Sequence, residues 1–437
     1  MSTCKIFSQF VQNLFIQNIE TISTRYGELT TALNRQFRDT DSKTANTLQV
    51  GSFGRKTGIN NISDLDMLYI MPESKWKNYN TSGGQLKLLQ DTKEAISKRY
   101  PKTKVQVDRL VVTVTYTNFH IEVQPVFEQD DGSYKYPDTK NGGSWKFTKP
   151  KEEMEAVNSL NKEKNLNLKR LCKMVRAWKN KHGIEMGGLL IDTLAYNFLT
   201  STPEYDDKSY SDYDCLSRDF FKYISELPDQ KEYAAPGSRQ RVKVKKKFQQ
   251  RAKKAYELCL KAIEAEEKNN NVNEKWKAVY GRPFPAAQEQ ISKASISQTQ
   301  ITTEEFIEDK FPVDICCQVK IDCEVTQNGF RKFLLRDMLE MRIPLKAKKK
   351  LKFRVSEWPQ VEEPFQIYWK VLNRGEEAQR RNCVRGQIVL DSGQRVKEES
   401  SDFQGDHVVE CYLVKNNIVV AKDRIHVPIV ADGSDYD

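Results

Sequence analysis

Features typical of secreted, metal-clustered or membrane-spanning proteins are scarce in this sequence. Its nine cysteines include no pair of CxxC motifs and no CxxC beside HxxxH, so they predict free, mostly buried thiols in a reducing compartment. No run of about eighteen apolar residues occurs, and the N-terminus lacks a basic segment followed by a long apolar stretch. We therefore expect a cytoplasmic protein, neither secreted nor inserted in a membrane. The four histidines are dispersed and show no metal-binding spacing: His120, His182, His407 and His426.

Length and composition favour a multidomain globular protein. The chain has 437 residues, which exceeds the usual size of a single core and predicts two or three domains. Its hydrophobic fraction is only 38%, but 20 Phe, 18 Tyr and 6 Trp argue for packed cores rather than disorder. Lys and Arg outnumber Asp and Glu by 70 to 60. This net charge of +10 favours anionic partners such as nucleotides, although a scattered excess could equally serve solubility.

Hydrophobic periodicity predicts the elements of the N-terminal part. Apolar residues at helical spacing over 5–38 predict one long amphipathic helix. The segment SDLDMLYIMP reads as a strand closed by Pro72, and further strands are predicted at VQVDRLVVTVTYT and HIEVQPVFE, with a turn at Asn118. Glycines divide the stretch 166–200 into two helices, and a basic helix is expected over about 240–268.

A change of period marks a second domain. Residues 286–309 are polar and nearly free of aromatics, which is typical of a linker. From 311 on, short alternating runs separated by turn residues predict a small all-β sandwich. The predicted division is therefore a core over 1–287, a linker over 288–310 and a sandwich over 311–437.

Two aspartates lie one residue apart in the strand SDLDMLYIMP. Because successive side chains of a strand alternate between faces, Asp64 and Asp66 share one face, about 6.5 to 7 Å apart at Cα, while Leu65 points into the core. Two carboxylates on one face repel each other and need a compensating positive charge. Mg²⁺ prefers oxygen ligands and commonly takes one or two carboxylates together with substrate phosphates. In HIEVQPVF the same alternation makes Glu122 a candidate third acid, with His120 on its face.

Gly51 and Ser52 follow the apolar run LQV upstream of these acids. Exposed backbone amides and a hydroxyl at such a turn can cradle phosphate oxygens, and glycine allows close approach. A phosphate cradle, two acids on a strand and a third on a neighbouring strand are what two-metal phosphoryl transfer requires. Either motif alone is more often a turn or a solvated strand end. The hypothesis therefore depends on their combination.

The ordered pattern G-S-x-x-R-x-T, D-L-D and h-E-h-x-P-x-F resembles the polymerase-β-like nucleotidyltransferase superfamily. Together with LKRLCKMVRAWKNKHG, YAAPGSRQRV and WKAVYGRPFP, it resembles the CD-NTases of anti-phage defence, bacterial relatives of cyclic GMP-AMP synthase, over about 5–287. The resemblance implies an α/β (α+β) bilobed fold, in which a mixed sheet bearing the acids faces a helical lobe, followed by the small all-β sandwich.

On this resemblance the site residues have the following roles. Gly51 and Ser52 are implied to bind the triphosphate. The metal ligands and catalytic acids are implied to be Asp64, Asp66 and Glu122, which would hold two Mg²⁺ ions, with Mn²⁺ as a substitute. Most members of the superfamily have an aspartate as the third acid, where this chain has Glu122.

Further nucleotide contacts are implied for Lys173, Arg176 and Ser238. Lys173 and Arg176 lie three residues apart on one helix face, and a solvated helix face explains them equally well. The run 239–254 concentrates nine Lys or Arg in sixteen positions but has Phe248 as its one aromatic residue. A solvated or phosphate-facing edge is therefore favoured over a nucleic-acid groove.

The last 125 residues resemble the β-rich domain proposed to act as a C-terminal nucleotide sensor beside adenylyl and guanylyl cyclases and these nucleotidyltransferases. Trp369 and Tyr368 alternate in a predicted strand, so at least one of them belongs to the core. A sandwich that merely docks on the enzyme is the alternative to a sensor. The residues in the characteristic motifs are Trp369, Lys370, Asn373, Arg374, Arg385 and His407.

The predicted function is synthesis of a cyclic di- or trinucleotide second messenger from nucleoside triphosphates, ATP among them. A linear oligoadenylate synthetase or RNA terminal nucleotidyltransferase is the nearest alternative, and a catalytically silent nucleotide sensor is an alternative of another class. A toxin-type nucleotidyltransferase usually has a far shorter chain. The resemblance implies a downstream effector activated by the product. We also expect a monomer, and the modest, aromatic-poor basic patches predict no stable nucleic-acid partner.

Overall fold

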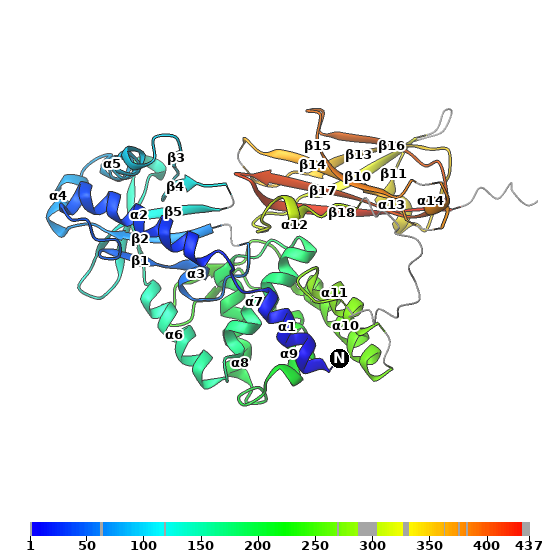
Figure 1. The fold of residues 1–437 in the computed structure, drawn as a ribbon, viewed down its shortest axis with the longest axis horizontal. Helices are drawn as coiled ribbons and strands as arrows, with labels where there is room; N and C mark the ends of the chain where they lie inside the picture. The colour runs from blue at the N-terminus through cyan, green and yellow to red at the C-terminus, as the bar shows by residue number, and fades with distance from the viewer. Residues whose placement is uncertain are drawn as a thin grey trace, which may run out of the picture. The chain divides into compact units, whose positions relative to one another are not determined.

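The computed structural model describes residues 2–61, 64–117, 119–268, 271–286, 304–326, 332–361, 363–374, 376–381 and 383–430. The chain divides into two compact units, drawn in Figure 1. The first unit is Met1–Lys181 with Met186–Ala287, and the second is His182–Glu185 with Gln288–Asp437. Across the described ranges, no helix combines the length and the apolar character needed to cross a membrane.

A mixed sheet forms the centre of the first unit. Its main strands run in the order β1-β2-β5-β4-β3, and β6 pairs with both β5 and β7. Strands β2 and β5 are parallel, whereas the other pairs are antiparallel. The strands are β1 (Thr47–Gln49), β2 (Asp64–Ile70), β3 (Lys104–Val107), β4 (Val112–Thr115), β5 (His120–Glu128), β6 (Tyr134–Asp138) and β7 (Ser144–Thr148).

Helices α2 (Ile19–Arg38) and α5 (Gly84–Arg99) supply the core against one face of this sheet. Leu65, Met67 and Tyr69 of β2 are buried in that core, as strand alternation requires. Asp64 and Asp66 are therefore left on the opposite face. The unit also contains α1 (Thr3–Asn13), α3 (Gly51–Gly54), α4 (Trp76–Tyr79) and short 3₁₀ turns at Glu73–Lys75, Lys140–Gly142 and Tyr210–Asp212.

Helices make up the rest of the first unit (Figure 1). They include the two helices predicted over 166–200, which the structure confirms as α7 and α8. The basic helix begins later than predicted, because Arg241–Lys243 form strand β9, paired with β8 (Glu232–Ala234). The helices are α6 (Pro150–Glu163), α7 (Asn167–His182), α8 (Gly188–Ser201), α9 (Tyr213–Glu226), α10 (Gln249–Glu267) and α11 (Val272–Tyr280).

The prediction of one unbroken helix over 5–38 is wrong. Two helices, α1 and α2, are separated at 14–18, where the amide groups of Leu14 and Phe15 donate to Val11 O and Gln12 O in tight turns. The carbonyl of Leu14 accepts from the Asn60 N–H (2.8 Å) instead of continuing the helix. Periodicity did not reveal the break because both helices keep apolar residues at helical spacing.

In its described residues, the second unit is a two-sheet sandwich with three short helices. One sheet has the order β11-β10-β13-β16 and the other β12-β18-β17-β14-β15, and both contribute to one hydrophobic core. The strands are β10 (Lys320–Thr326), β11 (Phe333–Leu334), β12 (Leu345–Lys346), β13 (Lys350–Glu357), β14 (Gln366–Leu372), β15 (Arg385–Leu390), β16 (Val396–Ser400), β17 (Gly405–Lys415) and β18 (Ile418–Val430). The helices are α12 (Ile307–Lys310), α13 (Leu335–Glu340) and α14 (Glu376–Arg380).

Packing of this unit already begins within the predicted linker. Lys370 Nζ contacts Glu304 Oε1 at 2.7 Å, and Ile307 is buried with Ile315 and Tyr412. Most of the predicted linker, the predicted turn at Asn118 and residues 431–437 lie outside the described residues. No disulfide joins any of the nine cysteines, all of which the structure describes, and five of them are buried, as predicted.

Candidate functional site

Three acids lie on one face of the two parallel strands β2 and β5. The register pairs Asp64 with His120 and Asp66 with Glu122. On the other face Leu65 and Ile121 are 3% and 0% exposed, whereas the side chains of Asp64 and Glu122 keep 42% and 35% exposure. The sheet therefore brings together acids that are 58 residues apart in sequence, on a face that a ligand can reach.

Negative charge on this face is only partly balanced. Burial raises the pKa of Glu122 to about 7, with further contributions from the negative charges of Asp64, Asp66 and the nearby Asp108. The His120 imidazole acts in the opposite direction. Its Nε2 lies 2.5 Å from Asp64 Oδ1 and 3.8 Å from Glu122 Oε1. A cation placed here would favour the ionised form of all three acids.

The three carboxylates suit a hard divalent cation such as Mg²⁺, but they do not form a complete coordination site by themselves. Carboxylate oxygens are the ligands that Mg²⁺ prefers, and Mg²⁺ usually keeps waters or substrate phosphates as additional ligands. In the part of the chain that the structure describes, no group of three or more His, Cys, Asp or Glu side chains is already arranged to hold a metal ion. Asp64, Asp66 and Glu122 would hold the ion together with oxygens of the bound substrate.

Gly51 packs directly against these acids. It begins α3 with φ +63°, and the preceding Val50 N–H donates to Asp66 O at 3.0 Å. A Cβ built on Gly51 would lie 1.7 Å from Asp66 Oδ2 and 2.6 Å from its Cγ. Only glycine therefore fits here, both for its backbone conformation and for the space that it leaves. Ser52 is its neighbour in α3, so the predicted phosphate cradle and the acids form one site.

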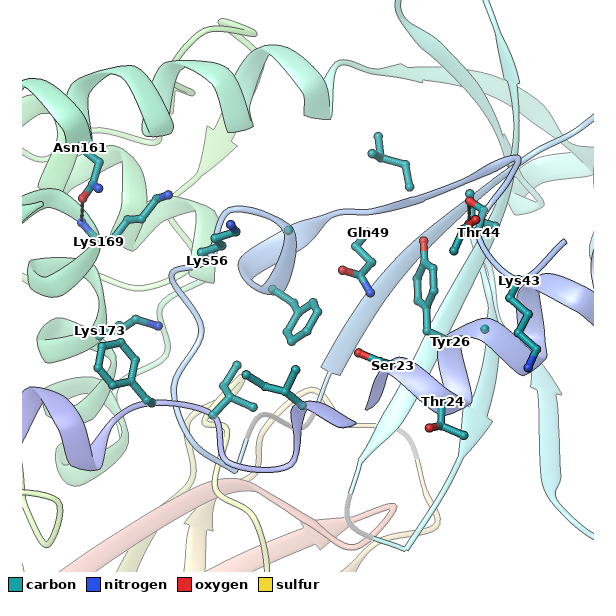
Figure 2. A pocket seen from close by; sticks show the side chains of 18 of the residues that line it. Ser23, Thr24, Tyr26, Lys43, Thr44, Gln49, Lys56, Asn161, Lys169 and Lys173 are labelled. Atoms are coloured by element: carbon teal, nitrogen blue, oxygen red, sulfur yellow. Dashed lines mark hydrogen bonds between the residues drawn. The ribbon is translucent and has the colours of Figure 1, made fainter. Parts of the chain in front are cut away.

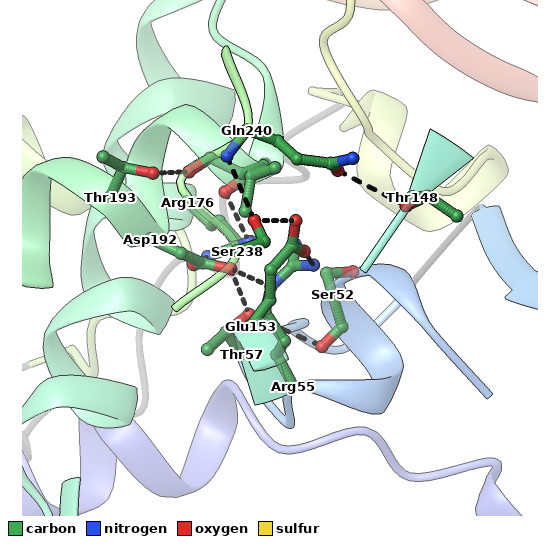
Figure 3. Close-up of polar contacts among 12 residues, drawn as sticks. Ser52, Arg55, Thr57, Thr148, Glu153, Arg176, Asp192, Thr193, Ser238 and Gln240 are labelled. Atoms are coloured by element: carbon green, nitrogen blue, oxygen red, sulfur yellow. Dashed lines mark hydrogen bonds and ion pairs between the residues drawn. The ribbon is translucent and has the colours of Figure 1, made fainter. Parts of the chain in front are cut away.

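Arg55 anchors this segment to the helical part of the unit through a buried network (Figure 3). Its Nε lies 2.9 Å from Asp192 Oδ2 on α8, and its Nη1 lies 3.3 Å from Glu153 Oε2 on α6. The Thr57 hydroxyl also donates to Asp192 Oδ2 at 2.9 Å. The Thr57 N–H and Gly58 N–H donate to Ser52 O at 2.9 and 3.0 Å, so the network continues directly into the Gly51-Ser52 segment.

Arg176 and Ser238 belong to the same network. Arg176 Nη1 lies 2.6 Å from Asp192 Oδ1, and its Nη2 donates to Gly188 O at 3.0 Å. Arg176 is only 6% exposed, so its guanidinium is largely shielded from the triphosphate contact that the sequence predicts. The Ser238 hydroxyl donates to Glu153 Oε1 at 3.1 Å, and Ser238 is partly exposed.

Lys173 points elsewhere. Its Nζ donates to Gly58 O, and it lines a cavity to which none of the three acids contributes. Burial, followed by the positive charge of Arg176, lowers the pKa of Lys173 to about 8. The structure therefore groups Gly51, Ser52 and the acids together but leaves Lys173 outside that group.

Replacing Asp192 by asparagine is expected to lower the free energy of unfolding by about 3 to 5 kcal/mol, because Arg55 and Arg176 then remain buried without their shared countercharge. Chemical denaturation of the purified variant measures this loss. Asp229→Asn, which breaks an exposed pair with Lys247, is the matched control and should cost at most about 1 kcal/mol. Equal losses in the two variants would contradict a stabilising role for the Asp192 network.

Sequence reasoning placed His120 on the face of the acids but missed its contact with Asp64, and it missed the charged network of Arg55, Glu153 and Asp192. Arg55 and Thr57 stand inside the motif G-S-x-x-R-x-T, so the motif itself was a signal for a role beyond phosphate binding. Asp192 carries no such signal in the sequence, because it is one acid in the apolar helix GLLIDTLAYNFL.

Family models match both units. A model described as "Second Messenger Oligonucleotide or Dinucleotide Synthetase domain" (SMODS) matches residues 1–161, and one described as "Adenylyl/Guanylyl and SMODS C-terminal sensor domain" (AGS_C) matches residues 301–430. The chain carries a SMODS domain followed by an AGS_C domain. The SMODS match includes Gly51, Ser52 and all three acids. A comparison with curated proteins gave no match.

Solved structures of bacterial CD-NTases resemble the chain in fold. The complex of Escherichia coli MS115-1 CdnC with HORMA-deltaN matches with a TM-score of 0.50 and 14% identity, over 64% of this chain and 98% of that chain. Escherichia coli MS115-1 CdnC with ATP gives a TM-score of 0.49 and 14% identity over the same shares. The Bradyrhizobium diazoefficiens CD-NTase CdnG in complex with GTP gives 0.48 and 11%, over 64% of this chain and 95% of that chain.

Within the AGS_C domain Trp369 and Lys370 contact other residues of the domain. Trp369 is 1% exposed in the core, and its Nε1–H donates to Asp391 Oδ1 at 2.9 Å, while Tyr368 packs partly exposed against Phe311. Trp369 is therefore the core member of the pair, and its ring has no free face for stacking a base. Lys370 is 3% exposed, between Glu304 and Glu410.

Three of the other motif residues of the AGS_C domain line a small cavity. Its volume is 140 Å³, and Asn373, Arg385 and His407 are among its lining residues. Arg385 is paired with Glu399, and His407 Nδ1 accepts from the Arg374 N–H at 3.1 Å. Ligand sites for nucleotide-sized molecules usually exceed about 300 Å³, so this cavity as it stands does not accommodate a nucleotide.

Proposed function

We propose that this protein is a Mg²⁺-dependent nucleotidyltransferase that joins nucleoside triphosphates into a cyclic di- or trinucleotide second messenger in anti-phage signalling. The observation that carries the proposal is the shared face of β2 and β5, where Asp64, Asp66 and Glu122 meet beside the Gly51-Ser52 segment. This site lies within the SMODS match, and the fold resembles that of CdnC.

In the proposed reaction, a ribose hydroxyl of one nucleotide attacks the α-phosphorus of a second. A phosphodiester bond forms, the bond between the α-phosphorus and its bridging oxygen to the β-phosphate breaks, and pyrophosphate leaves with that oxygen. Bound divalent metal would neutralise the triphosphate charge and favour deprotonation of the attacking hydroxyl. Gly51 and Ser52 position the triphosphate of the donor, and Glu122 lies nearest the attacking hydroxyl. Repetition of this step, with ring closure last, gives the cyclic product.

The Arg55 network has a positioning role in this proposal. It fixes Ser52 O through Thr57 and Gly58, and it joins that segment to α6 and α8. A phosphate cradle that is held before substrate binds needs no reorganisation during the reaction, which is where electrostatic catalysis gains most.

The test is incubation of the purified full-length chain with all four labelled ribonucleoside triphosphates and Mg²⁺ or Mn²⁺, with and without viral or cellular extracts. A phosphatase-resistant product supports the cyclic synthase. A phosphatase-sensitive ladder would select a linear oligonucleotide synthetase instead. Binding of divalent ions without product under every condition would favour a silent nucleotide sensor.

Metal binding is expected to depend on pH through Glu122. Because its pKa is about 7 in the absence of metal, Glu122 gains a proton as the pH falls below 7, and bound metal must displace that proton. Below pH 7 the apparent affinity for Mn²⁺ should therefore fall about tenfold per pH unit, whereas above pH 8 it should level off. Calorimetric titration between pH 6 and 8.5 measures this slope. Glu122→Gln should bind more weakly and flatten the slope, and an unchanged slope in that variant would assign the proton to another group.

A further inference from the structure

A second cavity, of 1340 Å³, lies in the first unit away from the acids (Figure 2). Figure 2 shows Ser23, Thr24 and Tyr26 of α2 on one side, and Lys169 and Lys173 of α7 on the other. Helix α3 contributes Phe53 and Gly54 between them. Neither Gly51, Ser52 nor any of the three acids is among its lining residues, so this cavity is distinct from the proposed catalytic site.

The walls of the cavity expose large apolar side chains. Phe15, Ile19 and Leu166 are 48%, 51% and 49% exposed and all three line it. Single exposed apolar residues are ordinary on a protein surface, but a group that faces one concave space marks a binding site. Flat aromatic surfaces are present too, since Tyr26 and Tyr210 also contribute to the lining. The cavity therefore offers contacts to an apolar, ring-shaped body.

Five cations surround the same space: Lys43, Lys56, Lys169, Arg170 and Lys173. In the described parts of the chain, none of them lies within 4 Å of a carboxylate oxygen, although ion pairs are frequent elsewhere in the unit. Glu28, the one acid among the described lining residues, is already neutralised by Arg25 and Arg99. The described lining residues therefore carry a net positive charge that no described carboxylate within 4 Å balances.

Like charges in this cavity also repel each other. Burial and the neighbouring positive charge of Lys56 lower the pKa of Lys169. Lys173 is 6% exposed, and its Nζ lies 5.6 Å from the ring centroid of Phe15. The Arg170 guanidinium lies 4.5 Å from the ring centroid of Tyr210. An anion bound among these groups would reduce the repulsion between the cations.

We propose that this cavity binds a small molecule with a flat aromatic ring system that carries two or more negative charges. The apolar walls and aromatic faces would hold the ring, and the unpaired cations would hold the anionic groups, whether phosphate, sulfonate or carboxylate. Its volume exceeds the roughly 300 to 1,000 Å³ typical of ligand pockets, so the ligand can be as large as a dinucleotide-sized molecule. A nucleic-acid strand fits less well, because the apolar side chains line a hollow rather than an open track.

The cavity and the catalytic site share helix α3. Phe53 and Gly54 line the cavity, while Gly51 of the same short helix touches Asp66. Lys173 also binds Gly58 O, next to Thr57 of the buried network. A ligand in the cavity would therefore contact the segment that positions the proposed triphosphate cradle.

The proposal is tested with pyrene-1,3,6,8-tetrasulfonate as a fluorescent probe. Its binding to the full-length chain is measured by fluorescence anisotropy in a buffer that contains EDTA. The double variant Lys56→Met with Lys169→Met should raise the dissociation constant at least about tenfold, since each lost ionic contact contributes about 0.7 kcal/mol or more. Removing two cations that repel each other should leave the fold intact, which circular dichroism verifies. Phe15→Glu, at an exposed position of the apolar wall, should weaken binding similarly.

Lys245→Met with Lys246→Met is the matched control, because it removes two exposed lysines outside the cavity and should change the dissociation constant less than twofold. The probe should bind equally to Asp64→Asn with Asp66→Asn, because these acids do not line the cavity. Loss of binding in that variant, or a loss in the lysine control equal to that in Lys56→Met with Lys169→Met, would overturn the proposal. Displacement by duplex RNA or DNA with a steep dependence on salt would assign the cavity to nucleic acid instead. None of these outcomes depends on whether the protein makes a cyclic nucleotide.

Discussion

Replacing both aspartates of β2 by asparagine is expected to lower product formation at least about 1,000-fold, whatever nucleotide the protein makes. Asparagine keeps the size of the side chain and the strand pairing of Asp64 with His120 and of Asp66 with Glu122. It removes the two negative charges that would hold divalent metal beside the triphosphate. Product is measured by thin-layer chromatography of labelled nucleotides, and the affinity for Mn²⁺ is measured by calorimetry on the same preparations.

The chain contains its own control for this experiment. A second pair of aspartates with the same spacing, Asp39 and Asp41, is exposed after α2, and Asp41 pairs with Arg35 there. Replacing this pair by asparagine removes the same charge from the protein but should leave product formation within about twofold. If both double variants lost activity equally, or if neither did, the assignment of Asp64 and Asp66 as catalytic acids would be wrong.

The acids could be predicted because their positions follow from strand alternation alone. A period of two places residues 64 and 66 on one face, and the only further requirement is that a strand carrying Glu122 lies alongside. The observed parallel pairing of β2 with β5 meets this requirement. The fold of the chain was accessible for a similar reason, since the change from helical to alternating periodicity near residue 311 separates two kinds of core.

The roles of the basic side chains could not be predicted in this way. Helical spacing indicates that Lys173 and Arg176 share a face of α7, but it does not indicate what lies opposite that face. Arg176 is held by Asp192, a single acid of an apolar helix, and Lys173 turns to Gly58 O and the second cavity. Both partners are distant in sequence, and their contacts depend on how α7 packs against α3 and α8.

Trp369 in the AGS_C domain is a second case in which the sequence pattern does not show what lies opposite a face. Alternation required Trp369 and Tyr368 to occupy opposite faces of their strand, and the structure selects Trp369 for the core. Which face is buried depends on the second sheet of the sandwich, whose strands come from other parts of the chain. A motif can therefore identify a domain without identifying which of its residues are free to bind a ligand.

Gly51→Ala is expected to lower product formation at least about 100-fold, although it adds a single methyl group. The new Cβ would lie 1.7 Å from Asp66 Oδ2, so either the aspartate must rotate away or α3 must move from the sheet. Both movements separate the proposed triphosphate cradle from its acid. We expect the Mn²⁺ affinity to fall together with product formation, because Asp66 is the side chain displaced.

Two other glycines serve as controls that distinguish the effect of this clash from the backbone strain that alanine introduces at a positive φ. Gly83 and Gly132 have φ +73° and +76°, close to the +63° of Gly51, but a Cβ at either position would meet nothing within 4 Å. Alanine at these positions costs about 1 kcal/mol of stability and should leave product formation within about twofold. Thermal unfolding of all three variants shows whether Gly51→Ala remains folded. If the three variants lost activity alike, the strain of the backbone rather than contact with Asp66 would explain why glycine is needed. If all three variants stay folded but only Gly51→Ala is inactive and binds Mn²⁺ weakly, the contact between the glycine and the carboxylate is what the site requires.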